Sequence, residues 1–314
     1  MVAPSGEQFE ITGGGYRAVV TECGAGLRLL EYDGRPVVAG YPEDEHASAG
    51  RGQLLLPWPN RIEDGRYTFG GRELQLPLSE VRRNNASHGL TRWASWTPEE
   101  LSPNSVSLLY RLMAQPGYPW TVDLHVVYDL SADGLTVTVT ASNLSTSPAP
   151  YAQGAHPYLT VADPDAVPGD GGAIDGWELT VPASTRELTD DRMLPAGRED
   201  VGGTDYDFRV ARPLRKIRLD HAFTDLTRDG EGRAQVELRD PRAGHAVALW
   251  MDEAHGWVQL YSGDDLPAGA RTSLAVEPMT AGPNAFASGE DLIVLGPAGE
   301  DADTHTSSWG IRVL

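Results

Sequence analysis

The chain has 314 residues, of which 40% are hydrophobic and 22% are charged, and its formal net charge is -20. A chain of this length can bury a substantial core, and its acidity disfavours nucleic acid, anionic membranes and polyanionic substrates as partners, because no broad basic field attracts them. The single cysteine, Cys23, excludes an intrachain disulfide, and no cysteine–histidine cluster predicts a zinc site, so we expect neither a metal nor another cofactor.

The N-terminal segment, residues 1–15, lacks an apolar core flanked by positive charge, which is the pattern of a signal peptide. No apolar run approaches the length that spans a membrane. We therefore expect a cytoplasmic protein that does not associate with a membrane.

The N-terminal third of the chain predicts β-strands. Residues 16–38 read as strand segments, interrupted by glycines at 24–26 and turned at Asp33-Gly34. Residues 66–69 and 72–76 flank Gly70-Gly71, which is the composition of a tight β-hairpin.

The clearest alternation of apolar and polar residues lies near the middle of the chain. Residues 121–130 alternate, and after a turn at Asp133-Gly134 residues 135–140 alternate again. Further strands are expected at 234–238, 246–251, 257–261, 273–276 and 292–295.

The 35 glycines and 23 prolines leave little room for long helices, and no segment has the pattern of an amphipathic helix of several turns. Residues 163–175 and 296–308 are expected to be surface loops, and the apolar end at 309–314 is expected to form a closing strand. No linker divides the chain. The sequence therefore predicts an all-β sandwich or related architecture, formed by residues 1–314 as a single domain.

The segment Gly154-Ala155-His156-Pro157-Tyr158 is the most informative candidate for chemistry. Proline restricts the preceding histidine to extended backbone, so the imidazole points in one direction from a strand end. Small residues beside it leave room for a ligand. A fixed, partly exposed imidazole is a natural proton donor or acceptor, although a lone histidine is about as often structural.

A second candidate is Glu277, which ends an apolar run and precedes Pro278. A carboxyl group in such surroundings is desolvated, which raises its pKa toward the range that is useful for a general base. The alternative is an edge-strand glutamate with no chemical role.

Other segments offer polar groups for a polyhydroxylated ligand. Asn60 and Arg61 follow Trp58, His88 precedes a glycine that permits close approach, and Asp220 can accept hydrogen bonds from a pair of hydroxyls. Each also has an ordinary structural explanation, as a turn, a cap or a salt bridge. Together with His156 and Glu277 they predict an acid/base site that binds a polyol.

The order of these segments is what identifies a family. The chain carries, in sequence, Pro-Asn-Arg-Ile at 59–62, His-Gly at 88–89, His-Pro-Tyr at 156–158, Asp-x-x-Phe at 220–223, Gln-x-Tyr-x-Gly at 259–263 and Glu-Pro at 277–278. This order resembles the aldose 1-epimerase (galactose mutarotase-like) family. The versions at 57–62 and 88–93 look most like a bacterial branch that includes a sulfoquinovose mutarotase.

The resemblance implies a large antiparallel β-sandwich that interconverts the α and β anomers of a free aldose without a cofactor. It implies that Glu277 removes the proton of the anomeric hydroxyl and that His156 protonates the ring oxygen. It assigns assistance at the ring oxygen to His88, and the orientation of hydroxyls to Asn60, Arg61, Asp220 and Gln259. The expected partner is a small sugar, bound by a monomer or a homodimer.

Two alternatives stay open. A hexose-6-phosphate mutarotase would need a cationic phosphate site, for which Arg82-Arg83 and the cations at 215–218 are candidates, although the net charge argues against it. A non-catalytic sugar-binding or regulatory module on the same fold would be expected to have lost Glu277 or His156, and both are present. The identity of the sugar also stays open.

Overall fold

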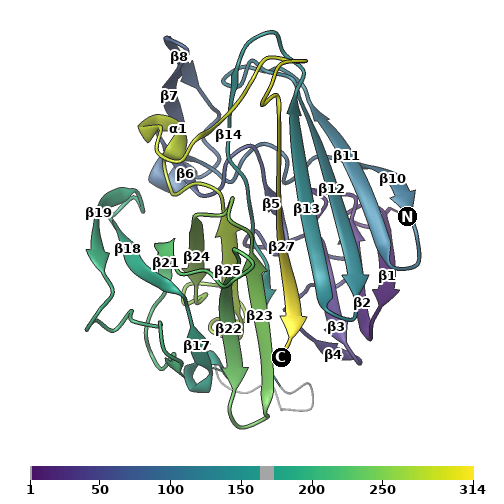
Figure 1. Cartoon of the computed structure of the whole chain (residues 1–314), viewed down its shortest axis with the longest axis vertical. Helices are drawn as coiled ribbons and strands as arrows, with labels where there is room; N and C mark the ends of the chain where they lie inside the picture. The colour runs from purple at the N-terminus through teal and green to yellow at the C-terminus, as the bar shows by residue number, and fades with distance from the viewer. Residues whose placement is uncertain (1, 163–172) are drawn as a thin grey trace.

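The computed structural model describes residues 2–162 and 173–314, and it consists almost entirely of antiparallel β-structure (Figure 1). The larger of its two main sheets has nine strands, in the spatial order β10 (Thr97–Leu101), β11 (Ser105–Leu112), β12 (Val122–Ser131), β13 (Gly134–Asn143), β27 (Thr304–Val313), β23 (His245–Met251), β22 (Ala234–Asp240), β17 (Glu178–Thr180) and β20 (Arg212–Pro213). The C-terminal strand β27 therefore joins the two halves of this sheet.

The second main sheet has eight strands and contains most of the segments that the sequence singled out. Its spatial order is β19 (Pro195–Asp200), β18 (Ala183–Thr189), β21 (Asp220–Leu226), β24 (Trp257–Tyr261), β25 (Leu274–Met279), β15 (Gly154–Ala155) and β5 (Leu54–Leu55), and β16 (Tyr158–Leu159) also pairs with β25. Every strand pairing among the described residues is antiparallel. The all-β, antiparallel prediction is confirmed.

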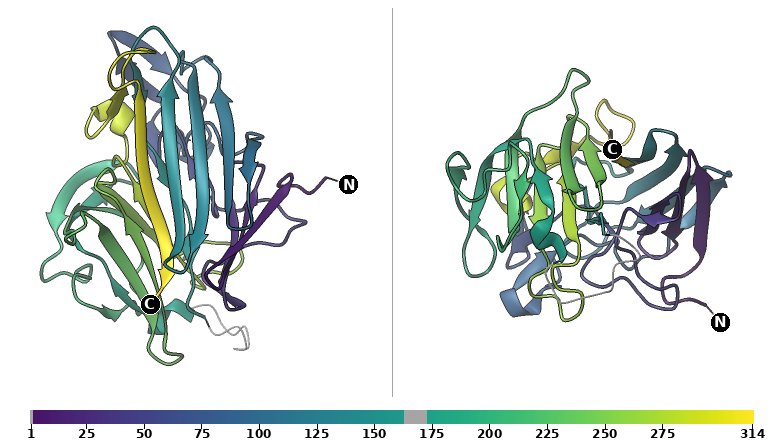
Figure 2. Two further views of the ribbon diagram at one scale, coloured as in Figure 1. Left: turned by 45° about the vertical axis from the view of Figure 1, so that its right-hand side comes forward. Right: turned by 90° about the horizontal axis from the view of Figure 1, so that it is seen from below.

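Smaller sheets complete the molecule. A four-stranded sheet consists of β1 (Gln8–Gly13), β2 (Tyr16–Thr21), β3 (Leu27–Tyr32) and β4 (Arg35–Pro36), and it lies beside the β11–β12 part of the nine-stranded sheet (Figure 2). Three strand pairs are β6 (Arg61–Glu63) with β9 (Asn85–Ser87), β7 (Arg66–Phe69) with β8 (Arg72–Gln75), and β14 (Ala149–Tyr151) with β26 (Ile293–Leu295). The described helices are short: η1 (Val81–Arg83), η2 (Ala173–Gly176) and α1 (Ala285–Ser288).

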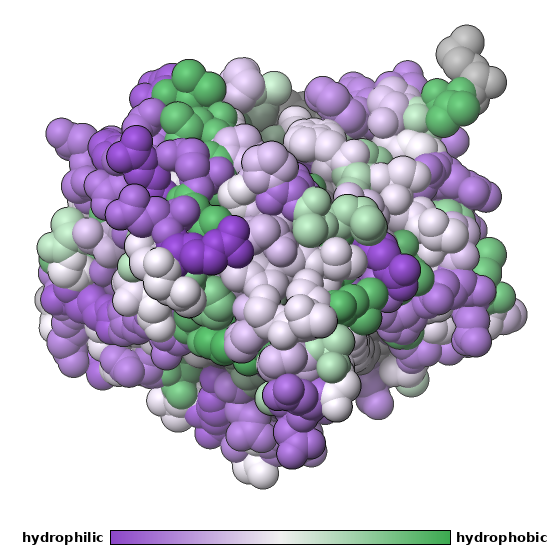
Figure 3. Space-filling model, turned by 90° about the horizontal axis from the view of Figure 1, so that it is seen from above, coloured by the Kyte–Doolittle hydropathy of each residue, from purple (hydrophilic) through white to green (hydrophobic). Residues whose placement is uncertain are grey.

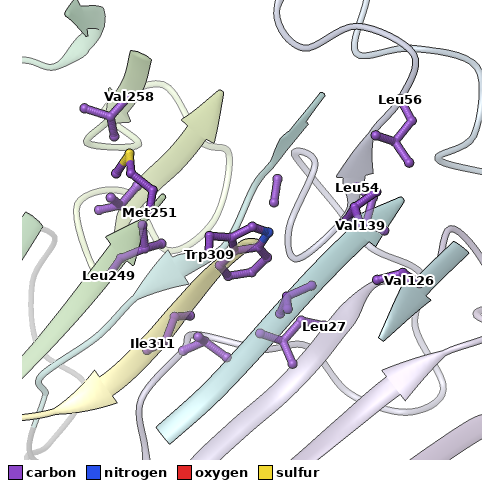
Figure 4. Close-up of a cluster of buried hydrophobic side chains, with 14 of the residues drawn as sticks. Leu27, Leu54, Leu56, Val126, Val139, Leu249, Met251, Val258, Trp309 and Ile311 are labelled. Atoms are coloured by element: carbon purple, nitrogen blue, oxygen red, sulfur yellow. The ribbon is translucent and has the colours of Figure 1, made fainter. Parts of the chain in front are cut away.

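The main core lies between the sheets. Figure 4 shows side chains from β3, β5 and β24 gathered with those of β12, β13, β23 and β27, and all of them belong to one buried cluster. The regular alternation of β12 and β13 supplies one wall of it, because every second side chain of these strands is buried. The eight-stranded sheet is thus fixed against a packed layer, which gives the residues of its strands defined positions.

Strand β27 corrects one sequence prediction. Residues 296–308 were expected to be a loop, but the strand begins at Thr304. Its polar residues pair across β13 through hydroxyl groups, as in Thr138 with Ser308 at 2.9 Å and Thr140 with Thr306 at 3.0 Å. Such a ladder stabilises a strand without an apolar pattern, so hydropathy alone did not find it.

Several other segments were not predicted as strands or fall outside the structure. All five residues of β10 are exposed, and β19 is exposed at five of its six positions, so neither has an alternating pattern. Most of the loop expected at 163–175 lies outside the described residues, and 173–175 begin the helix η2. Strands of this kind are held by backbone pairing, which composition reports poorly.

The surface is mixed in polarity where it is visible. In the view of Figure 3, hydrophobic residues occur in small patches among hydrophilic ones. Among the described residues, no helix is both long and apolar enough to cross a membrane.

Candidate active site

A polar pocket of about 330 Å³ contains every site residue that the sequence predicted. This volume is at the lower end of the range for small-molecule sites. The predicted residues reach it from six places in the fold: the start of β6, the residue after β9, the link between β15 and β16, and strands β21, β24 and β25. They are Asn60, Arg61, His88, His156, Asp220, Gln259 and Glu277.

Three of these residues come from adjacent strands of the eight-stranded sheet. Gln259 on β24 is directly opposite Glu277 on β25, and Asp220 starts β21 on the other side of β24. Side chains two residues apart on a strand share a face, so this register places all three on the face that lines the pocket. Gln259 Nε2 donates to Asp220 Oδ1 at 2.7 Å, and Gln259 Oε1 accepts from Asn60 Nδ2 at 3.3 Å. The result is a continuous row of amide and carboxyl groups.

His156 lies in contact with Glu277 across the base of this row. Its Nε2 is 3.3 Å from Glu277 Oε1, and its ring stacks on Tyr158 with centroids 5.1 Å apart. The backbone on both sides of the ring is fixed, since His156 N–H donates to Gln53 O and His156 O accepts from Gly52 N–H. The expectation of a partly exposed imidazole is wrong, because only 6% of His156 is exposed.

Gly50, and not the small residues next to His156 in the sequence, leaves room for a ligand beside the imidazole. A Cβ at Gly154 would meet Pro59 at 2.9 Å, and Gly154 does not line the pocket, so that glycine permits packing between strands. Gly50 does line the pocket, has a φ of +74°, and would place a Cβ 2.7 Å from His156 Cδ2. The absence of a side chain at Gly50 therefore leaves the imidazole accessible from that side.

A short strand pair positions Asn60 and His88 together. Arg61 pairs with Ser87 across β6 and β9, and the N–H of His88 donates to the carbonyl of Asn60 at 2.8 Å. Both Asn60 and His88 have positive φ, 52° and 60°, which turns their side chains out of the strand direction. The rings of His88 and His156 are 5.6 Å apart between centroids. The two histidines therefore form one cluster.

Arg61 is held by an acidic partner that was not predicted. Its Nε donates to Glu80 Oε2 at 2.8 Å and its Nη2 to Glu80 Oε1 at 3.2 Å, while Arg83 Nη1 donates to the same carboxylate at 2.7 Å. Burial opposes ionisation of Glu80, but the hydrogen bonds and charges of Arg61 and Arg83 outweigh it and lower its pKa. This network fixes Arg61 beside Asn60 Oδ1, 3.5 Å away.

Burial dominates the proton affinities at the centre of the pocket. It raises the pKa of Glu277 well above its ordinary value, and the nearby Asp220 carboxylate adds to the effect. Burial and the charge of Arg92 lower the pKa of His156 to about 3, and the same two causes lower that of His88. Desolvation also raises the pKa of Asp220. The contacting pair therefore favours a neutral imidazole beside a protonated carboxyl group.

Three buried polar atoms of pocket-lining residues have no hydrogen-bond partner among the described residues. They are Glu277 Oε2, His88 Nδ1 and His156 Nδ1. Buried polar atoms are normally paired, and an unpaired one that lines a cavity is suited to a ligand. A molecule rich in hydroxyl groups can both donate to Glu277 and interact with His88.

The pocket also contains residues that sequence reasoning did not assign, in addition to Glu80 and Gly50. They include Arg92, Trp93, Tyr261 and Asp265, and the Tyr261 hydroxyl donates to Asp265 Oδ1 at 2.5 Å. Arg92 and Trp93 lie within the family-like segment 88–93, and Tyr261 lies within the motif at 259–263. The sequence therefore marked these three residues but assigned no role to them. Asp265 and Glu80 had no motif to mark them.

The comparison with known proteins establishes the family. The sequence profile described as aldose 1-epimerase matches residues 7–307. The chain belongs to the aldose 1-epimerase family. It is therefore an isomerase, in agreement with the prediction from the ordered motifs.

The relatives of this chain include an aldose 1-epimerase, and solved structures share its fold. The Escherichia coli protein called "uncharacterized protein YihR" is 35% identical over 93% of this chain and 89% of its own. The Escherichia coli aldose 1-epimerase is 26% identical over 74% of this chain and 66% of its own. The aldose epimerase homologue from C. elegans has the same fold, with a TM-score of 0.84 at 20% identity, covering 98% of both chains.

Proposed function

We propose that this isomerase interconverts the α and β anomers of a free aldose by general acid–base opening and closure of the sugar ring, with Glu277 and His156 as the proton-transfer pair. The observation that carries the proposal is the contact of 3.3 Å between Glu277 Oε1 and His156 Nε2 at the base of a polar pocket.

The contact has the geometry that a cyclic sugar requires. The anomeric carbon bears two oxygens, the anomeric hydroxyl and the ring oxygen, so a base and an acid that serve them must be neighbours. Glu277 offers the unpartnered Oε2 to the anomeric hydroxyl, and His156 offers Nε2 to the ring oxygen. His88, whose ring is next to that of His156, supports the ring oxygen.

The proposed reaction needs one proton, which Glu277 and His156 share, for the proton transfers to balance. That proton favours Glu277, and its transfer across the contact gives a carboxylate and an imidazolium. The carboxylate then removes the anomeric hydroxyl proton while the imidazolium protonates the ring oxygen, and the bond between the anomeric carbon and the ring oxygen breaks. Rotation about the C1–C2 bond presents the other face of the aldehyde. Closure returns both protons and forms the other anomer.

The remaining polar groups select and hold the sugar. Asp220, Gln259 and Asn60 form a hydrogen-bonded row beside Glu277, and Arg61 is fixed at the end of that row by Glu80. A row of fixed donors and acceptors orients hydroxyls and reduces the freedom that the bound sugar must lose. These residues are proposed to contact the carbons away from the ring oxygen.

Anomer equilibration tests the proposal directly. A crystalline α-aldose, freshly dissolved, is followed by polarimetry or by NMR of the anomeric protons, with a panel of hexoses and pentoses. We expect the protein to accelerate equilibration, and Glu277→Gln and His156→Asn each to lower kcat by roughly 10²–10⁴-fold, since positioned proton transfer contributes about that much.

Glu300→Gln is the matched control, because it makes the same chemical change at an exposed position outside the pocket. Its rate should equal that of the wild type. No acceleration with any sugar of the panel would contradict the proposed activity, and an unimpaired Glu277→Gln variant would contradict the assignment of the base.

The two alternative functions are a hexose-6-phosphate mutarotase and a non-catalytic sugar-binding module. Of the five cations considered for a phosphate site, only Arg83 lines the pocket, and it is paired with Glu80; the other four are Arg82, Arg215, Lys216 and Arg218. A non-catalytic sugar-binding module would bind sugar without accelerating equilibration, so the same panel separates it from the proposed enzyme.

A further inference from the structure

Arg192 connects the hairpin of β18 and β19 to a segment that lines the pocket. It lies in the turn between these strands, on the same side of the molecule as β6 (Figure 1). Its guanidinium donates to the carbonyls of Arg83 and Asn84, each at 3.0 Å, to Asn85 Oδ1 at 3.2 Å and to Asp64 Oδ1 at 2.7 Å. One side chain therefore joins two parts of the chain that are at least 107 positions apart in sequence.

The turn that carries Arg192 is itself closed by hydrogen bonds. Asp190 Oδ1 accepts from the N–H of Arg192 at 2.8 Å and from the N–H of Leu194 at 2.9 Å, and the N–H of Asp190 donates to the carbonyl of Leu194 at 2.9 Å. An aspartate that binds nearby backbone N–H groups in this way stabilises a turn. The guanidinium is therefore presented from a fixed backbone.

Arg192 supplies donors to the end of the short helix η1. The last carbonyls of a helix have no partner within it, and an arginine side chain can donate to them. Arg83 is the last residue of η1, and Asn84 follows with a left-handed φ of 55°. The contacts of Arg192 with both carbonyls fix the backbone where the chain turns from η1 into β9.

The same guanidinium contacts both strands of the β6–β9 pair at one end. Glu63 on β6 is directly opposite Asn85 on β9, and Arg192 Nη1 donates to Glu63 Oε1 at 3.3 Å. Two positions along the same pair, Arg61 is opposite Ser87, and both of these residues line the pocket. Arg192 therefore holds the end of the strand pair that leads to the pocket.

Asn85 and Glu80 connect Arg192 to the pocket through their side chains. Asn85 is fully buried, and its Nδ2 donates to the carbonyl of Arg192 at 3.0 Å and to Glu80 Oε2 at 3.4 Å. The N–H of Glu80 also donates to the carbonyl of Asn85 at 3.0 Å. Glu80 in turn holds Arg61 and Arg83, which both line the pocket. Only Asn85 and Glu80 separate Arg192 from Arg61 in this network.

We propose that Arg192 is a positioning residue for sugar binding, which acts through Asn85 and Glu80 to hold Arg61 where it binds hydroxyls of the substrate. The proposal rests on the proposed function, which assigns hydroxyl binding to Arg61. None of residues 183–200, all of which the structure describes, lines the pocket, so Arg192 acts on its neighbours and not on the sugar. A donor that is fixed before the sugar arrives reduces the freedom that is lost on binding.

Loss of Arg192 should weaken binding and preserve the chemical step. Glu277 and His156 are positioned by other elements, β25 and the link between β15 and β16. Removing an interaction that is equal in the bound sugar and in the transition state raises KM and leaves kcat unchanged. We expect Arg192→Gln to raise KM by roughly 10-fold, as the displacement of one charge-assisted hydrogen bond permits, with kcat close to that of the wild type.

The experiment measures kcat and KM of anomer equilibration by NMR, with the most active sugar of the panel. The variants are Arg192→Gln, Arg192→Lys, Glu80→Gln and the double variant with Arg192→Gln and Glu80→Gln. Arg192→Lys should recover part of the wild-type KM, because an ammonium group donates hydrogen bonds but lacks the planar fork. Glu80→Gln should raise KM at least as much as Arg192→Gln. The double variant should have the KM of Glu80→Gln alone, because residues on one path do not act independently.

Arg198→Gln is the matched control. Arg198 lies on β19 of the same hairpin, its side chain has a similar exposure, 38% against 33% for Arg192, and its ion pairs are with Glu187 and Glu290. The control should leave KM unchanged, whereas a general loosening of the hairpin would raise KM in both variants and overturn the proposal.

The proposal is also overturned if Arg192→Gln leaves KM unchanged, if it lowers kcat alone, or if its effect on KM multiplies with that of Glu80→Gln. Circular dichroism shows whether each variant is folded. If Arg192→Gln does not fold, Arg192→Lys takes its place, and a KM equal to that of the wild type then overturns the proposal. If the wild type equilibrates no sugar, the proposed function fails, and calorimetric binding of the panel sugars to the same variants decides the role of Arg192.

Discussion

The Glu277 carboxyl group and the His156 imidazole are in contact at a site where burial penalises a charge on either. Burial raises the pKa of Glu277 and lowers that of His156, so the pair is more stable as two neutral groups. Under the proposed function, a sugar that hydrogen-bonds to Glu277 Oε2 should reduce the penalty for forming the ion pair. We therefore expect sugar binding to favour transfer of the proton from Glu277 to His156.

The buried carboxyl group predicts a pH-dependent difference in stability between wild type and Glu277→Gln. Above its ordinary pKa of 4.5, the unfolded chain releases the Glu277 proton while the folded protein retains it, because its folded pKa is raised. Wild-type stability therefore falls as pH rises, by up to about 1.4 kcal/mol per pH unit, until the folded carboxyl group ionises. Glutamine does not titrate, so the variant should gain stability relative to wild type as pH rises above about 5, until the folded carboxyl group ionises.

Thermal or denaturant unfolding of both proteins at a series of pH values above about 5 measures this difference. His156 has the opposite sign, since its depressed pKa removes stability as pH falls below 6.5, but this contribution is common to both proteins. Glu300→Gln, at an exposed position, serves as the control for the removal of one carboxylate. A difference that stays constant with pH would show that Glu277 does not retain its proton on folding.

The site residues could be predicted from short motifs in the sequence, but the partners of their side chains could not. All seven residues that the sequence singled out line one pocket, because each lay in a short segment with an unusual combination of chemistry and backbone restriction. The partner of Arg61 is Glu80, 19 positions away in a segment without a motif. Whether a charged side chain has a partner of opposite charge depends on distant parts of the fold, which a short linear motif does not record.

At the scale of elements, the segment before β5 shapes the pocket as much as the strands do. Gly50 has a φ of +74° and lies against the His156 ring, where a Cβ would come within 2.7 Å of Cδ2. The ring cannot easily retreat, because it stacks on Tyr158 on one side and contacts Glu277 on another. A methyl group at residue 50 must therefore displace the imidazole or the segment.

Gly50→Ala should consequently impair turnover beyond its effect on stability. The left-handed backbone costs an alanine roughly 1 kcal/mol wherever it occurs. Displacing a catalytic group by about 1 Å can cost about 100-fold in rate. We expect a mild loss of thermal stability together with a fall in kcat of anomer equilibration.

Gly70→Ala isolates the backbone contribution. Gly70 has a φ of +56° in the β7–β8 hairpin, and a Cβ there meets nothing within 4 Å. It should lose comparable stability and keep its activity. Equal activity of both alanine variants would mean that Gly50 does not determine the position of His156.

The most predictable elements were those with a regular alternation of apolar and polar residues or a clear turn. Strand β12 and the hairpin of β7 and β8 around Gly70-Gly71 were found to within one residue, and β13 extends three residues past its predicted end at residue 140. The exposed strands β10 and β19 and the hydroxyl-rich start of β27 were not, because backbone pairing and Ser/Thr ladders hold them in place. Sequence periodicity identifies strands with a regular alternation of apolar and polar residues and misses strands or strand ends that lack it.

At the scale of the whole molecule, β27 connects parts that are far apart in sequence. It pairs with β13 on one side and with β23 on the other, and Trp309 and Ile311 project from it into the core of Figure 4. The nine-stranded sheet is therefore completed only when the C-terminal strand is in place. The prediction of a single domain over residues 1–314 follows naturally from this closure and remains to be tested.

Unfolding provides that test, with Trp309→Ala as the probe. Removing a buried tryptophan typically costs about 3–5 kcal/mol, and Trp309 is 2% exposed. If the sheets form one cooperative unit, the variant should unfold in a single transition at lower temperature, seen alike by circular dichroism, tryptophan fluorescence and loss of equilibration activity. The pocket would then be lost together with the nine-stranded sheet, although none of its lining residues belongs to that sheet. Two separated transitions, with activity following only one of them, would instead divide the chain into domains on either side of β27.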